Sequence, residues 1–201
     1  MTSDALRRAL TVPGDPPLRP LPDQVVALLE TLQAPPRLAA HLRAVHDVAA
    51  QLTDALTDRF PQLPVNRAAV LFGAATHDMG KVVHPEELSG PGSAHEPAGY
   101  ELLLRHGVAA SLARYARTHA SWQEAGIEVD DLLVSLADKI WKGKRVTDLE
   151  QLLVDRLADV TGREPWSVFL DLDDILDRIG ADADRRLAFQ ATHPVQGHPV
   201  V

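Results

Sequence analysis

Apolar residues recur along most of the chain at steps of three and four residues, which is the spacing of one face of an α-helix. The longest stripe consists of Leu38, His41, Val45, Val48 and Leu52, so a histidine interrupts an apolar face. We expect helices over about 23–32, 36–59, 66–79, 95–105, 107–121, 129–144, 147–161 and 165–189. Strand-like alternation is missing, so the sequence predicts an all-α fold, a bundle of seven or eight helices.

Prolines and the loss of periodicity mark the two ends of the helical region. Residues 12–22 read VPGDPPLRPLP, and proline disfavours helix interiors, so we interpret residues 1–22 as a proline-rich lead-in. The last residues, 191–201, show no periodicity and are expected to form a flexible tail. One helical domain is therefore expected over 23–190.

The composition is that of an ordinary globular protein. The chain has 201 residues, of which 45% are hydrophobic and 24% charged, enough for one domain with a buried core. It contains no long uncharged apolar run, and its N-terminus lacks the apolar segment of a signal peptide. We therefore expect a cytoplasmic protein that does not associate with membranes.

Charge and cysteine content narrow the chemistry. The chain has no cysteine and nine histidines, so a bound metal would be held by His, Asp or Glu. A formal net charge of −8 argues against a duplex nucleic-acid partner, because neutralising phosphates needs clustered Lys and Arg. The one dense basic cluster, KIWKGKR at 139–145, suits a small phosphorylated molecule instead.

Several histidines and carboxylates fall on inward-facing positions. His41 shares its stripe with valines, His77 and Asp78 end an apolar helix, and His119 and Asp138 lie on apolar faces. A lone inward histidine is usually a hydrogen-bonded core residue, but a buried carboxylate needs a partner or a metal. Divalent metals favour such a mixture of imidazole nitrogen and carboxylate oxygen.

These residues carry a resemblance to a known family. His41, the pair His77-Asp78 within HDMGK, and Asp138 within ADKI resemble the signature of the HD-domain superfamily of metal-dependent phosphohydrolases. The resemblance covers about 36–145 and implies that the predicted bundle has the HD-domain helical fold.

Two further histidines refine the resemblance. His95 in AHEPAG and His119 in RTHASW are similar to the additional ligands of HD proteins that bind two metals, such as the HD-type diadenosine tetraphosphate hydrolases. The segment HEPAGYE does not reproduce the Gly-Tyr-Pro motif of the cyclic-di-nucleotide phosphodiesterases, which argues against that subfamily.

The resemblance implies two divalent metal ions. It assigns one ion to His41, His77, Asp78 and Asp138, and the other to His95, His119 and Asp78, with Asp78 as the bridge. Iron or manganese is the first choice, and nickel, cobalt or magnesium are alternatives. Two such ions would share a hydroxide that attacks phosphorus at neutral pH.

Basic residues near these ligands are candidates for contact with a substrate. Gly80 is expected to end the helix 66–79, so that Lys81 projects over the site, binding phosphate or stabilising the transition state. Lys142 and Arg145 follow Asp138 and could bind phosphate, and His84 could protonate a leaving group. The alternatives are a lysine that complements the helix dipole, a solvated basic face and a surface histidine.

A second His-Asp pair and two aromatic residues have simpler interpretations. His46 and Asp47 lie on the same helix as His41 but on a different face, so we interpret them as outside the site. Tyr115 and Trp141 lie on inward stripes and are expected in the core or in a pocket wall.

Three functions remain open at this level. The first is metal-dependent hydrolysis of a phosphate ester or anhydride, with a nucleotide or related small metabolite as substrate. The second is a mixed-valence diiron oxygenase, because certain HD-fold oxygenases use the same ligand set. The third is a non-catalytic protein that binds metal or senses a ligand. The short step from His119 to Asp138 resembles that of the dinucleoside-polyphosphate hydrolases more than that of the oxygenases, and this resemblance favours the first function.

Overall fold

The computed structural model describes residues 2–195, and all regular structure in that range is helical. This confirms the predicted all-α fold. The α-helices are α1 (Asp4–Thr11), α2 (Asp23–Thr31), α3 (Pro36–Arg59), α4 (Arg67–Thr76), α5 (His95–Arg105), α6 (Ala110–Ala113), α7 (Tyr115–Thr118), α8 (Val129–Ile140), α9 (Thr147–Thr161), α10 (Pro165–Gly180) and α11 (Ala183–Ala191). Two 3-10 helices, η1 (Met79–Val82) and η2 (Pro85–Leu88), connect α4 to α5. Because α6 and α7 are single turns of four residues, nine longer α-helices form the bundle in the described range.

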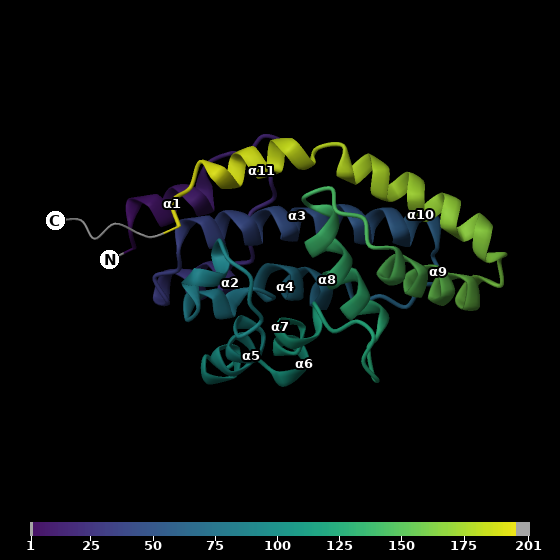
Figure 1. Cartoon of the computed structure of the whole chain (residues 1–201), viewed down its shortest axis with the longest axis horizontal. Coiled ribbons are helices and arrows are strands. Elements are labelled where there is room, and N and C mark those ends of the chain that lie inside the picture. Colours follow the sequence, from purple (N-terminus) through teal and green to yellow (C-terminus); the bar gives the residue numbers. More distant parts are fainter. Residues whose placement is uncertain (1, 196–201) are drawn as a thin grey trace.

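Helix α3 lies at the centre of the helical bundle. It begins with Pro36 at its first turn, a position where the missing N–H costs no hydrogen bond. Helices α1, α11 and α10 run along one side of α3, while α2, α4 and α8 lie on the other side, with α5 to α7 beyond them (Figure 1). A helix covered on both sides needs apolar or paired side chains around most of its circumference, and α3 is buried on nearly every face.

Two hydrophobic clusters meet along α3. One cluster contains the first two turns of α3, up to Leu42, together with α1, α2 and part of α5. The other begins at Ala44 and joins the rest of α3 to α8, α9 and α10. His41 therefore lies near the junction of the two clusters, where polar groups from several helices can gather.

The N-terminal lead-in contains a helix that the sequence pattern did not reveal. Helix α1 has only eight residues, which is a short window for periodicity, although its buried residues Leu6, Ala9 and Leu10 have helical spacing. Its first turn is capped by Ser3, whose hydroxyl accepts a hydrogen bond from the Leu6 amide at 3.1 Å. The buried Arg43 guanidinium donates to the carbonyls of Ala9 (2.7 Å) and Val12 (3.0 Å) and so fastens α1 to α3.

Four predicted helices differ in their bounds, and one of them, predicted over 129–144, ends at Ile140. The stretch 107–121 forms the separate turns α6 and α7, and 165–189 is broken between α10 and α11. The helix predicted over 66–79 ends at Thr76, with Asn66 as its N-cap as expected. In the range that the structure covers, no helix has both the length and the apolar character needed to span a membrane.

The tail predicted to be flexible begins as packed chain. The Arg37 amide donates to the Pro194 carbonyl at 3.0 Å, and the Arg37 side chain donates to the His193 carbonyl at the same distance. His193 is buried and packs edge-on against Phe189. These contacts hold 193–194 against the start of α3, and the predicted tail over 196–201 lies outside the described residues.

Candidate metal centre

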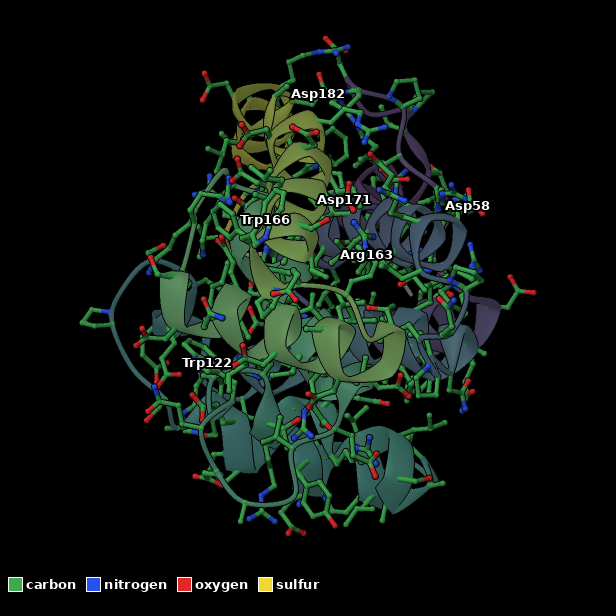
Figure 2. All side chains as sticks on the ribbon, turned by 90° about the vertical axis from the view of Figure 1, so that its right-hand side faces the viewer. Asp58, Trp122, Arg163, Trp166, Asp171 and Asp182 are labelled. Carbon is green, nitrogen blue, oxygen red and sulfur yellow. The ribbon has the colours of Figure 1, made fainter. Side chains whose placement is uncertain are left out.

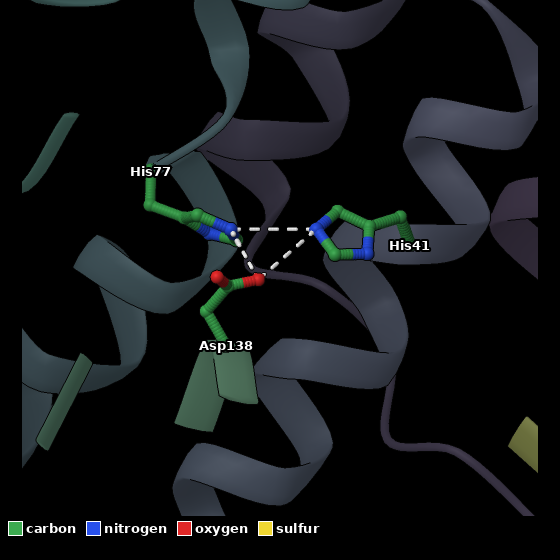
Figure 3. A group of neighbouring side chains, drawn as sticks. All are labelled: His41, His77 and Asp138. Carbon is green, nitrogen blue, oxygen red and sulfur yellow. Dashed lines mark hydrogen bonds and ion pairs between the residues drawn. The ribbon is translucent and has the colours of Figure 1, made fainter. Parts of the chain in front are cut away.

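Three long helices bring the first group of predicted ligands together. His41 comes from the second turn of α3, His77 directly follows α4, and Asp138 lies near the end of α8. The Nε2 atoms of His41 and His77 are 3.3 Å apart, and each lies within 3.7 Å of Asp138 Oδ1 (Figure 3). All three residues are buried, so their polar atoms face one another rather than water.

The second group comes from shorter elements. Asp78 immediately precedes η1, His95 is the first residue of α5, and His119 directly follows α7. Asp78 Oδ1 lies 3.0 Å from His95 Nε2 and 3.6 Å from His119 Nε2. Within each of the two groups, the three potential ligand atoms lie within 4.8 Å of one another.

Asp78 joins the two groups because its two carboxylate oxygens face different partners. Oδ2 is 3.1 Å from His41 Nε2 and 3.6 Å from His77 Nε2, whereas Oδ1 faces His95 and His119. A carboxylate held in this way can contribute one oxygen to each of two neighbouring cations. The structure thus brings all six predicted ligands into one centre.

The imidazoles of His77 and His119 are oriented by the helices that precede them. The Nδ1 atom of His77 lies 2.9 Å from the Ala74 carbonyl, and that of His119 lies 3.1 Å from the Ala116 carbonyl. Carbonyls in the last turn of a helix have no partner within the helix and can accept these bonds. With the proton on Nδ1, the Nε2 lone pair of each ring faces the centre.

His95 is oriented by a carboxylate that the sequence analysis did not identify. Its Nδ1 lies 2.5 Å from Glu87 Oε2, and its amide also donates to that oxygen. Glu87 lies in η2, inside the HPEEL stretch, and its nearness to His95 depends on how the intervening loop folds back. A carboxylate behind a metal-ligating histidine fixes the tautomer and raises the basicity of the ligand.

Close packing of two glycines positions the second group. A Cβ atom added to Gly80 would lie 1.9 Å from the His95 carbonyl oxygen, and one added to Gly99 would lie 2.9 Å from the Gly80 amide nitrogen. Gly80 therefore allows η1 to pack directly on α5. This corrects the prediction that Gly80 serves as a helix stop, since α4 has already ended at Thr76.

The protonation states suit metal ligands. Burial alone would raise the pKa of Asp78, but the charge of His77 and close contacts with His41 and His95 outweigh it and hold the pKa well below its usual range. Burial and the charge of His77 lower the pKa of His119 to about 3. Near pH 7 Asp78 is therefore ionised and His119 neutral, as metal ligands require, whereas burial of His95 is outweighed by its contacts with Asp78 and Glu87, which raise its pKa.

The donor set fits divalent metal ions. The Nε2 atom of His95 is buried and lies 3.0 Å from Asp78 Oδ1, yet outside hydrogen-bond geometry, so its lone pair has no partner in the described residues. The Nε2 atoms of His41 and His77 also face each other at short range. Nitrogen and oxygen donors that converge in this way match the preference of borderline divalent ions.

Two lysines lie against the two carboxylates. Lys81 Nζ is 2.6 Å from Asp78 Oδ2, and Lys139 Nζ is 2.6 Å from Asp138 Oδ2. Both side chains remain partly exposed, at 18% and 13%. Lys81 therefore lies beside the centre, and its contact with a substrate stays a prediction. Lys139 was not singled out, although it directly follows Asp138 in the basic cluster.

Arg145 does not reach the centre, contrary to prediction. Its guanidinium bonds to Glu150 at 2.8 Å, to Asp173 at 2.6 Å and to Asp177 at 2.7 Å. Glu150 and, to a smaller extent, Asp173 raise its pKa, and the bonds to Asp173 and Asp177 tie the α8–α9 connection to α10. The partners lie far along the chain, so helical spacing after Asp138 could not reveal them.

Lys142 and His84 lie at the periphery. The exposed Lys142 places its ammonium 5.8 Å from the ring of Trp141, which in turn packs edge-on against His41. His84 is 31% exposed and contacts Glu86 at 3.3 Å, and in the described range its side chain makes no hydrogen bond to the six predicted ligands. Neither residue touches the centre directly.

The second His-Asp pair lies outside the centre, as its position on α3 indicated. Asp47 accepts hydrogen bonds from the Arg19 amide and from the Gln51 side chain. Burial lowers the pKa of His46 to about 4. Tyr115 and Trp141, expected inside, are both buried in the core.

An all-helical bundle with buried His and Asp residues converging at its centre defines the class of this protein. A family model described as the HD domain matches residues 38–143, more than half of the chain, so the chain belongs to the HD domain family. This family is part of a superfamily of the metal-dependent phosphohydrolase type, and the matched segment contains all six converging residues. Among curated proteins and among solved structures, no significant match was found.

Proposed function

We propose that this protein is a metal-dependent phosphohydrolase that acts on a nucleotide or a related small phosphorylated metabolite. The observation that carries the proposal is Asp78, whose two oxygens face two separate groups of imidazoles. Two divalent ions held there, with iron or manganese as the first choice, would supply a water that is deprotonated at neutral pH and would neutralise phosphate charge.

The lysines support phosphate rather than another ligand. Lys81 and Lys139 each present an ammonium beside a carboxylate of the centre, and both are partly open to solvent. When cations occupy the carboxylates, these ammonium groups are free to bind the oxygens of a phosphate and the charge that develops on them. His84, on the adjoining loop, is our candidate for donating a proton to the leaving group.

The size and charge of the chain support a small substrate. The net charge of −8 opposes a long polyanion, whereas the two lysines suffice for one or a few phosphates. The resemblance to the HD-type diadenosine tetraphosphate hydrolases makes dinucleoside polyphosphates the first compounds to assay.

Metal analysis combined with a substrate panel tests the proposal. The protein is purified without added metal, its metal content is measured, and it is assayed with nucleotides, dinucleoside polyphosphates and sugar phosphates after reconstitution with each candidate ion. We expect phosphate release that requires metal, stops with a chelator and continues without oxygen. Release from no compound with any ion would overturn the proposal.

The same assay separates the two alternative functions. An oxygenase would consume oxygen and would lose its activity under anaerobic conditions. A protein that only binds metal or senses a ligand would contain the ions but turn over none of the compounds in either atmosphere. The lysines against both carboxylates support the hydrolase, because their ammonium groups suit the oxygens of a phosphate.

A further inference from the structure

The loop that follows His119 carries a tryptophan beside the metal centre. Lys139 Nζ lies 5.6 Å from the ring centre of Trp122 and 2.6 Å from Asp138 Oδ2. Because both contacts share one ammonium, the Trp122 ring centre lies within about 8 Å of Asp138 Oδ2, the sum of these two distances. The separation is comparable with the ribose that connects the phosphate and the base of a nucleotide.

Trp122 is partly packed against the core and partly open. It packs on the cluster that contains α3, α8, α9 and α10, while the residue remains partly exposed. It also lines a cavity of about 260 Å³ between the loop and the start of α9. An aromatic ring held in this way is a preformed stacking surface.

The chemistry of this cavity suits a neutral, hydrogen-bonding group. Its polar lining comes from Ser121, Gln123, Glu124 and Asp148, which offer an amide, a hydroxyl and two carboxylates. Among the described residues no basic side chain lines it, so a phosphate would be repelled there, whereas the edge of a nucleobase offers donors to carboxylates.

We propose that Trp122 and Lys139 form a nucleotide subsite, in which Lys139 binds the phosphate next to the metal ligands and Trp122 stacks against the base. The proposal rests on the phosphohydrolase function proposed above and selects nucleotides within it. At 5.6 Å the ammonium lies near the outer limit of a cation–π contact, which leaves the ring accessible to a stacked base. Base stacking on aromatic side chains is tolerant of base identity, so several bases fit.

The other two tryptophans are not suited to this role. Trp141 is 3% exposed and packs edge-on against His41, with ring centres 4.8 Å apart, so its faces are covered. Trp166 is 67% exposed near the start of α10, in a different part of the molecule from Trp122 (Figure 2). Trp166 therefore serves as a matched control.

Comparison of two phosphate substrates tests the subsite. The full chain, loaded with manganese, is assayed with AMP and with ribose 5-phosphate, which lacks the base. We expect Trp122→Ala to raise KM for AMP about tenfold and to change KM for ribose 5-phosphate less than about twofold, because one stacked base is lost. Trp122→Phe restores most of the difference, and Trp166→Ala changes neither value.

Lys139 is tested in the same assay. Lys139→Gln is expected to raise KM for both substrates, because it removes a contact to the phosphate that they share. An equal effect of Trp122→Ala on both substrates, or no effect on either, would overturn the stacking role. Unchanged KM values in Lys139→Gln would overturn the phosphate role.

Direct binding keeps this inference separate from the proposed function. Equilibrium dialysis of AMP against the manganese-loaded protein requires no turnover. Weaker binding of AMP to Trp122→Ala, with unchanged binding to Trp166→Ala, supports the subsite even if no compound is hydrolysed. Equal binding by the two variants rejects the subsite even if hydrolysis is observed. Circular dichroism melting of each variant shows that the fold is retained.

Discussion

The two groups of candidate ligands are held by different kinds of structure. His41, His77 and Asp138 lie in or next to α3, α4 and α8, which pack against one another through the core. Asp78, by contrast, lies between α4 and a 3-10 helix, and its partners are at the ends of the peripheral α5 and α7. Ligands on packed helices are held more firmly than ligands on connecting segments. We therefore expect the second group to hold its ion more weakly than the first.

The largest effect is expected at the residue that the two groups share. Asp78→Asn removes the charge from both, so metal content and phosphate release should fall below detection, as measured by elemental analysis and by the hydrolysis assay. The matched control is Asp47→Asn in the other His-Asp pair, which should lower stability and leave the metal content unchanged. Full metal content in Asp78→Asn would show that the carboxylate is no bridge.

The addition of a single methyl group should abolish metal binding by one group of ligands and not by the other. Gly80→Ala places its Cβ 1.9 Å from the His95 carbonyl oxygen, so α5 must move away and take His95 with it. Overpacking of this kind costs about 1–3 kcal/mol, and we expect one ion to be lost while the other remains. Titration with metal, followed by calorimetry, measures the stoichiometry.

A glycine with free space provides the control for this substitution. A Cβ at Gly180 in α10 would lie at an ordinary 3.5 Å from Ile140, so Gly180→Ala should leave both ions bound and the melting temperature equal or higher. If Gly80→Ala retains both ions at wild-type affinity, the second group does not depend on the packing of η1 on α5.

A smaller effect is expected from substitution of Glu87, whose carboxylate contacts the His95 ring. Glu87→Gln keeps the shape but weakens the bond to His95 Nδ1, so affinity for the second ion should fall about 10- to 100-fold, while the first ion is unaffected. Glu86→Gln, a change at the exposed neighbour that contacts His84, should leave both affinities unchanged. Equal losses of both ions in Glu87→Gln would contradict the independence of the two groups.

Acid should weaken the metal-free fold through buried histidines. The pKa of His46 is about 4 in the fold, below its ordinary value of 6.5, because burial disfavours the charged ring. Between about pH 6.5 and 4, His46 binds a proton in the unfolded chain but not in the folded chain, so the free energy of unfolding falls as the pH drops.

Substitution of this histidine measures its share of the acid sensitivity. Urea unfolding at several pH values should show a shallower decline for His46→Gln, by on the order of 2 kcal/mol between pH 6.5 and 4. Because His46 lies outside both ligand groups, added metal should not remove its contribution, whereas metal should suppress that of His119. An unchanged decline in His46→Gln would show that other groups control the acid response.

Helical periodicity predicted the elements wherever a clear apolar stripe was present. The predicted helices 36–59 and 147–161 coincide with α3 and α9, because long stripes depend on local spacing alone. Helix α1 was missed because it is only eight residues long and directly precedes the proline-rich segment. The breaks between α6 and α7 and between α10 and α11 were missed because periodicity continues across them.

The sequence predicted which residues form the candidate centre, but not which other side chains surround them. The order of His41, His77-Asp78, His95, His119 and Asp138 suggested that these residues meet, and the structure brings them together, while their role as ligands stays a prediction. Glu87 and Lys139 could not be selected, because neighbouring residues give no sign of which side chains point to the same place.

By itself the sequence determined the all-helical fold, the inward positions of the histidines and aspartates, and the family, since each depends on residue type and local spacing. Tertiary structure decided which charges meet. It paired Arg145 with three carboxylates and placed Trp122 beside Lys139. It also determined why position 80 is a glycine, because η1 packs directly on α5 and leaves no room for a Cβ atom there. Such contacts depend on how helices pack, and no periodic pattern within one helix contains that information.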